Sequence, residues 1–204
     1  MLTSRAAPVL AALAALLAAA PPAAAREFVE VARGAEKLES LEPFLARYIG
    51  RCKDPVERRA CEANVAAARR AFDGKTFTVR VTDAAPLVRP KLEGQGFLLL
   101  VTPFVDGGGL ALTNGAPARQ DGEGRPIVGL IPIRGKLPPG TLELEFQGPF
   151  RTGAIELEIV FRPERTWKLP RKGEPGSLEG VAARFLGIRV LDGRTGNEIA
   201  SKAL

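Results

Sequence analysis

The spacing of apolar residues is helical from residue 36 to residue 74, where they recur every three or four positions. In the first half of this segment the repeating residues are Leu41, Leu45, Tyr48 and Ile49. Ser40 precedes them directly, and serine is a favoured N-cap residue because its hydroxyl can accept a backbone hydrogen bond. We therefore predict a first helix that begins after Ser40 and buries one stripe.

The second half of this segment has a more sharply marked start. Asp54 is a favourable cap, Pro55 suits the first helical position, and Glu57 stands three residues after the cap, as in a capping box. Gly74 is a typical stop. A stripe of small apolar residues then follows one face: Val56, Ala60, Ala63, Ala67 and Ala71. We predict a helical hairpin over residues 26–74, and we expect this narrow face to pack closely on a sheet.

After residue 74 the apolar period becomes two, which is typical of strands with one buried face. Residues 75–82 are the clearest case, because Phe77, Val79 and Val81 alternate with polar residues. Further strands are predicted at 96–105, 109–114, 127–134, 141–147, 154–162, 184–191 and 198–203, divided by glycine and proline clusters. The expected class is α+β, with the hairpin packed on a mainly antiparallel β-sandwich or partly open barrel over residues 75–204. Residues 26–204 are expected to form one structural unit.

Residues 1–25 have the pattern of a secretory signal peptide. Arg5 lies near the start, an alanine-rich apolar run follows over residues 6–20, and Pro21 and Pro22 precede three alanines. Cleavage is expected after Ala25. The run is too weakly apolar for a permanent membrane span, and no transmembrane segment is predicted after cleavage. The protein is therefore predicted to be periplasmic or secreted.

The chain has two cysteines, Cys52 and Cys61, one at each side of the connection between the predicted helices. An even count in an oxidising compartment favours a disulfide, which would stabilise the fold by about 2–3 kcal/mol through loop closure. The alternative is a reactive pair. The spacing is not that of a C-x-x-C motif, and no histidine is present to lower a thiol pKa, so redox catalysis is disfavoured.

Composition removes several classes of function. The chain has no histidine, which excludes imidazole-based triads and zinc sites that need histidine. Without Arg5 the 29 basic residues become 28 against 23 acidic ones, a net charge of about +5. This excess is modest, and few aromatic residues accompany the basic ones, so nucleic acid is not an expected partner. No catalytic residue is assigned.

A cluster of acidic residues is predicted at the strands 141–147 and 154–162. If the loop between them joins the strands symmetrically, their apolar faces coincide and four carboxylates form a ladder: Glu143, Glu145, Glu156 and Glu158. Opposed like charges destabilise a hairpin, so compensation by Arg80 or Arg189 from an adjacent strand is the favoured interpretation. The alternatives are a calcium site or the acid and base pair of a glycosidase.

A basic segment surrounds Trp167, the only tryptophan. Its residues are Arg162, Arg165, Trp167, Lys168, Arg171 and Lys172. Such a segment could contact an anionic surface such as phospholipid headgroups or acidic polysaccharide. The favoured interpretation is an edge strand or long connection in which Trp167 and Leu169 cover the core, because Pro163 and Pro170 are typical of an edge.

Several segments together resemble a known kind of protein. They are residues 41–48 (LEPFLARY), Cys52 and Cys61, residues 100–104 (LVTPF) and residues 186–190 (LGIRV). The chain resembles an uncharacterised family of secreted proteins from GC-rich bacteria, a domain of unknown function. The resemblance implies a single exported unit with paired cysteines and brings no known activity or site residue.

These observations favour a non-catalytic extracytoplasmic module of the bacterial envelope with a binding or structural role. The expected partner is an envelope protein or polysaccharide, and neither a cofactor nor a metal is assigned. Two alternatives remain: a histidine-free hydrolase that uses carboxylates on glycan, and a module stabilised by calcium.

Overall fold

The computed structural model describes residues 23–50, 52–82, 88–90, 96–102, 104–106, 109–112, 130–132, 140, 142–147, 155–170 and 177–204. The helices in this part of the chain are α1 (Ala23–Ala32), α2 (Leu41–Ile49) and α3 (Arg58–Phe72). The strands are β1 (Glu36–Leu38), β2 (Phe77–Val81), β3 (Val88–Pro90), β4 (Gly96–Val101), β5 (Phe104–Val105), β6 (Gly109–Leu112), β7 (Leu130–Pro132), β8 (Leu142–Gln147), β9 (Ile155–Pro170), β10 (Ser177–Asp192) and β11 (Glu198–Ala203). The predicted α+β class is confirmed.

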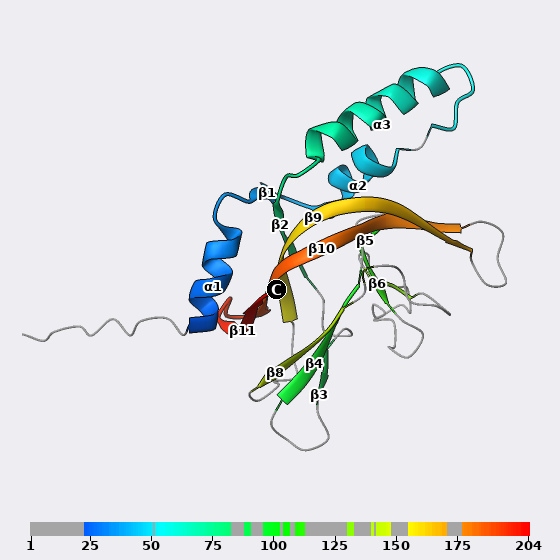
Figure 1. Cartoon of the computed structure of the whole chain (residues 1–204). Coiled ribbons are helices and arrows are strands. Elements are labelled where there is room, and N and C mark those ends of the chain that lie inside the picture. The colour runs from blue at the N-terminus through cyan, green and yellow to red at the C-terminus, as the bar shows by residue number, and fades with distance from the viewer. Residues whose placement is uncertain are drawn as a thin grey trace, which may run out of the picture.

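The strands form two sheets that together make a curled half-barrel (Figure 1). The larger sheet has the order β1-β2-β9-β10-β5-β6-β7, and β11 pairs with β10 beside β5. The smaller sheet has the order β3-β4-β8. Pairing is antiparallel except between β1 and β2 and between β6 and β7. The expectation of a mainly antiparallel, partly open barrel is therefore confirmed.

The central feature is the long antiparallel pair of β9 and β10, which curve together across the molecule (Figure 1). Each has 16 residues and extends well past the strands predicted at 154–162 and 184–191. The predicted strand ended before Pro163, because proline usually interrupts a strand. In the structure β9 continues through Pro163, and the pairing register with β10 shifts there, between Ala182 and Ala183, opposite Arg165 and Pro163. A β-bulge of this kind accommodates proline and increases the bend of the strands.

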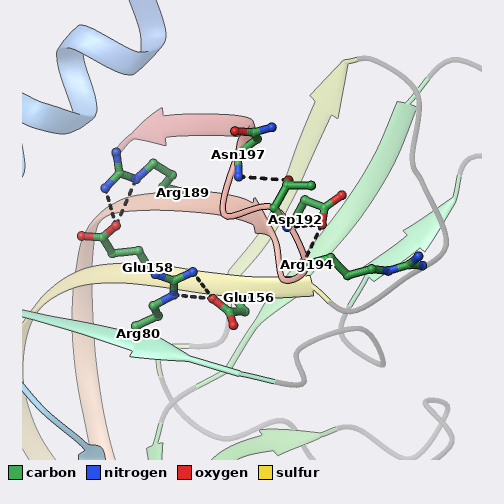
Figure 2. Close-up of polar contacts among 8 residues, drawn as sticks. Arg80, Glu156, Glu158, Arg189, Asp192, Arg194 and Asn197 are labelled. Carbon is green, nitrogen blue, oxygen red and sulfur yellow. Dashed lines mark hydrogen bonds and ion pairs between the residues drawn. The ribbon is translucent and has the colours of Figure 1, made fainter.

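A tight turn after β10 leads into β11. The Asp192 carboxylate accepts hydrogen bonds from the backbone N–H groups of Arg194 and Thr195, at 2.8 and 3.1 Å (Figure 2). The Asp192 N–H donates to the carbonyl oxygen of Asn197 at 2.9 Å, which closes the turn. This is the turn that the sequence predicted between the last two strands, and the predicted strand at 198–203 is confirmed.

The hydrophobic core lies on the inner face of the long strands. Along β9 the core residues alternate with outward-facing ones: Ile155, Leu157, Ile159 and Phe161 are all fully or almost fully buried. Residues of β4 and β8 cover this face from one side, and α2 covers it from the other. One continuous core therefore connects both sheets with α2.

Helix α1 packs on a different surface, beside β10 and β11 (Figure 1). Phe28 is 1% exposed, and a Cβ placed on Gly187 would lie only 3.2 Å from its ring. The glycine in β10 thus leaves the space that the phenylalanine occupies. The cleavage predicted after Ala25 lies within α1 and would retain Phe28; the leader stays a prediction.

Two expectations about the helical segment were wrong. The first is its start, because residues Glu36–Leu38 form a strand that pairs in parallel with β2. The second is the start of α3, which begins at Arg58 rather than directly after Asp54. The Asp54 carboxylate instead accepts a hydrogen bond from the Val56 N–H at 2.8 Å, which stabilises a turn before the helix. Helix α2 does begin after Ser40, although the serine makes no side-chain capping bond.

Candidate functional site

The predicted pairing of the acidic strands was wrong. Strand β8 pairs with β4 in the smaller sheet, whereas β9 lies between β2 and β10 in the larger one. In β8, Leu144 lies opposite Leu99, and Phe146 stacks on Phe97 with ring centroids 5.2 Å apart. The apolar face of β8 is therefore satisfied by β4, and the hairpin that would place Glu143 and Glu145 directly opposite β9 does not form.

The two glutamates of β9 are bridged by arginines from its neighbouring strands (Figure 2). Arg80 of β2 pairs with Glu156, and Arg189 of β10 pairs with Glu158, whose Oε2 accepts from Nε at 3.0 Å. The Arg189 guanidinium also lies 4.8 Å from the centre of the Phe28 ring. Compensation by Arg80 and Arg189 is thus confirmed. Carboxylates engaged in this way are poorly suited to act as a glycosidase acid and base.

The other two glutamates, Glu143 and Glu145, are exposed on β8, and Glu145 accepts a hydrogen bond from the Gln147 amide at 3.2 Å. In the described part of the chain, no three acidic or cysteine side chains come together in a way that could hold a metal ion. The four glutamates therefore do not form a single chemical site in the described structure.

The basic segment around Trp167 forms the far half of β9. Trp167 is 6% exposed, packs in a small cluster with Val105 and Ala182, and lies opposite Gly180 of β10. Lys168 forms an ion pair with Glu179, and Arg162 donates a hydrogen bond to Thr76, while Arg165 is exposed. Arg171 and Lys172 lie outside the described residues. Burial of the indole, with Leu169 packed against it, agrees with the favoured interpretation and leaves no aromatic anchor for an anionic surface.

The predicted disulfide between Cys52 and Cys61 is present, with the Cα atoms 5.5 Å apart. It ties the segment that leaves α2 to the first turn of α3. At the same end of α2, the Arg69 guanidinium donates to the backbone carbonyl of Tyr48 at 2.8 Å and to that of Ile49 at 3.4 Å. These carbonyl groups have no partner within the helix, so Arg69 acts as a cap supplied by α3.

Helix α3 does not pack on the sheet as the sequence predicted. Helix α2 lies between α3 and the strands (Figure 1), and Phe72 is the only buried residue among the 15 of α3. The alanines of the small stripe are exposed, and Val56 before the helix is 90% exposed. The face expected to contact the sheet is open to solvent instead.

A groove of about 830 Å³ runs between α2 and α3. Three polar residues, Arg47, Glu57 and Asn64, line it. Its other lining residues are Ala46, Gly50, Ala60, Cys61, Val65, Ala67, Ala68 and Ala71, of which Val65 has the largest apolar side chain. We call this surface the hairpin groove, and its volume lies within the range of ligand pockets.

The surroundings of the hairpin groove are basic. Helix α3 contains four arginines and one glutamate, a charge of +3. With about 100° between successive residues, the arginines lie away from the alanine stripe, and Arg59 and Arg70 flank its outer side. No ion pair joins these two exposed arginines to any other residue for which the structure gives a position.

The sequence contained the signal for this groove, but the stripe was assigned to the wrong neighbour. The disulfide and the short connection hold α3 against α2. Large apolar side chains, which could reach past α2 to the sheet, are missing from α3 except at Val65 and Phe72. With α2 already covering the sheet, these constraints leave the alanine face of α3 open to solvent.

Fold and groove define a class of protein: an α+β half-barrel that carries a disulfide-linked helical hairpin on its surface. The chain belongs to a family of unknown function, DUF6066, whose model matches residues 6–202. This confirms the resemblance to an uncharacterised family; secretion stays a prediction.

Comparison with curated proteins and with solved structures gave no match. None of the described helices is both long and apolar enough to cross a membrane.

Proposed function

We propose that the protein is a non-catalytic binding module of the bacterial envelope that holds a partner protein in the hairpin groove. The observation that carries the proposal is the exposure of α3. A helix with only Phe72 buried gains little from folding onto the body, yet a disulfide and the Arg69 cap fix its position. Fixing an otherwise exposed helix is useful when the helix presents a surface to a partner.

Two further observations support the location and the kind of partner. A disulfide persists in an oxidising compartment, which fits the signal peptide predicted over residues 1–25. The groove is lined mainly by alanine and other small apolar residues, and only three of its lining residues, Arg47, Glu57 and Asn64, are polar. A protein surface is therefore a better match for it than a glycan or a metabolite.

The proposal is tested by photo-crosslinking in intact cells of the source organism. A photoreactive amino acid is placed at Ala67 inside the groove and, as a control, at Thr195 in the exposed turn after β10. We expect a discrete protein adduct from position 67 that is lost when Ala60→Trp fills the groove, and no such adduct from position 195. Adducts of equal yield from both positions, or none from position 67, would contradict the proposal.

The location is tested separately by intact-mass analysis of the protein purified from its native compartment. The expected mass is that of a chain that begins at Arg26 and has no free thiol. A chain that retains residues 1–25, or that has two free thiols, would place the module elsewhere.

A further inference from the structure

The hairpin groove has the length and shape of a helix-binding site. Its lining residues on α3 run from Ala60 to Ala71, with Glu57 at one end, which corresponds to about 20 Å at 1.5 Å per residue. Alanines along this line let a second helix axis come close, and helices pack with axes about 8–10 Å apart when the contact residues permit it. A helix of about four turns would therefore fill the groove.

The side chains that such a helix presents to the groove can be specified. Its inward face meets alanines and Val65 on α3 and the Ala46 and Gly50 surface on α2, so apolar residues are required there at spacings of three and four. Because the lining residues are small, the partner has to contribute the larger side chains to fill the space. This is the helix-in-groove mode of recognition.

Charge selects among helices that satisfy these conditions. Arg47 lines the groove on the α2 side, and Arg59 and Arg70 flank the alanine stripe on the outer side of α3. A helix with glutamate or aspartate beside its apolar stripe would place these carboxylates next to the guanidinium groups. Complementary charge of this kind increases the association rate and disfavours basic competitors.

We infer that the partner bound in the hairpin groove is an acidic amphipathic helix of about four turns. The inference rests on the proposed function, because it names the partner of the same groove. It commits to a different protein rather than a second copy, since two α3 helices would bring charges of +3 against +3. It also disfavours a lipid surface, because the exposed face of α3 offers alanine instead of bulky apolar residues.

The test is selection from a display library of helical peptides. Each peptide of 16 residues has a fixed helical frame, apolar residues varied on one face, and flanking positions varied among acidic, basic and neutral residues. Selection uses the full mature protein as bait, with counter-selection against Ala67→Trp. The matched control for added bulk is Glu62→Trp, which lies on the opposite side of α3.

We expect the selected peptides to carry an excess of acidic residues at the flanking positions, and to be helical when bound. Their affinity should fall about tenfold or more on Arg59→Glu with Arg70→Glu, and should weaken at high salt. Reversing two exposed charges elsewhere, by Arg194→Glu with Lys202→Glu, changes the net charge equally and should leave the affinity within about twofold.

Other outcomes separate this inference from the proposed function. Groove-dependent peptides that are neutral, basic or not helical would overturn the acidic helix, while a specific crosslink at position 67 would still support a binding module. A library without any groove-dependent binder would overturn the inference as well. Self-association that Ala67→Trp abolishes, measured by sedimentation, would replace it with a second copy of the chain.

Discussion

Helices α2 and α3 are joined by one short connection and one disulfide, yet they depend on different sources of stability. Helix α2 buries five of its nine residues in the main core, and its Phe44 ring lies within 5.3–5.7 Å of the rings of Tyr48, Phe72, Phe77 and Phe161. Helix α3 buries only Phe72. Burial of aromatic surface along its whole length therefore fixes α2, whereas α3 is fixed by one buried ring at its end together with covalent and polar contacts to α2.

This difference shows how one hairpin can contribute an inner helix to the core and an outer helix with a free face. The inner helix belongs to the body of the protein, and substitutions there should unfold the whole domain. The outer helix relies on alanine, which has the highest helix propensity, and on its attachment points, so its free face can vary without a loss of core packing. Measurements that compare substitutions in α2 and α3 test this division directly.

The largest effect is expected for Phe44→Ala. This change removes a ring that is 3% exposed and touches four other aromatic residues, and it should lower the free energy of unfolding by about 3–5 kcal/mol. The matched truncation in α3, Glu62→Ala, removes an exposed side chain and should change it by less than about 0.5 kcal/mol. Chemical denaturation provides both values. If the two changes lower the free energy of unfolding by similar amounts, α3 contributes as much to the stability of the domain as α2 does.

The next largest effect is expected for the double change Cys52→Ala with Cys61→Ala. The disulfide closes a loop with a sequence separation of 9, and its loss should cost about 2–3 kcal/mol through the entropy of the unfolded chain. Hydrogen exchange should show the greatest loss of protection in α3, because this helix has little else to hold it. If the amides of β9 and β10 lose as much protection as those of α3, the outer helix is not an independently fixed element.

How far the fold could be predicted is clearest from the strands. Alternation located β2, β8 and β11 to within two residues, since a period of two identifies the buried face. The same alternation does not identify the partner strand. The apolar face of β8 fits β9 as well as it fits β4, so the pattern alone could not distinguish the predicted hairpin from the sheet that forms.

The candidate site illustrates a similar limit. Sequence located the disulfide and the alanine stripe, because each depends on residue type and short spacing, and it located Arg80 and Arg189 as partners of Glu156 and Glu158 because clustered carboxylates require nearby positive charge. It did not predict the open groove, because the position of α3 depends on what α2 already covers. Nor did it predict α1, whose alanine-rich start overlaps the predicted leader.

A smaller effect is expected at the contact between the two helices. Gly50 has a φ of +71°, and a Cβ there would lie 2.1 Å from a Val65 methyl carbon. Gly50→Ala should therefore cost about 1–3 kcal/mol from backbone strain and overlap. Adding Val65→Ala should recover the part due to overlap and leave the backbone part, and a double-mutant cycle separates the two. If Val65→Ala restores none of the stability lost in Gly50→Ala, then α3 and α2 are farther apart at Gly50 and Val65 than the structure places them.

The smallest effect is expected from the titration of Tyr48, the only tyrosine, which lies at the boundary between the two helices. Burial raises the pKa of Tyr48 above its usual 10.0, the Arg69 guanidinium partly offsets this, and Asp73 and Glu164 raise it further. The unfolded chain then loses the phenol proton more readily than the folded one. Stability is accordingly unaffected below pH 10.0 and falls as the pH rises from there through the folded pKa.

Ultraviolet absorbance of the phenolate reports this titration without interference from another tyrosine. We expect Tyr48→Phe to abolish the signal and to remove this part of the alkaline loss of stability. Arg69→Met should move the pKa of Tyr48 still higher, because it removes the charge that favours the phenolate. A pKa that is unchanged or lower in Arg69→Met would mean that this α3 side chain does not reach the α2 ring. The outer helix would then be held by the disulfide near its start and by the buried Phe72 at its end, without a polar contact to α2 between them.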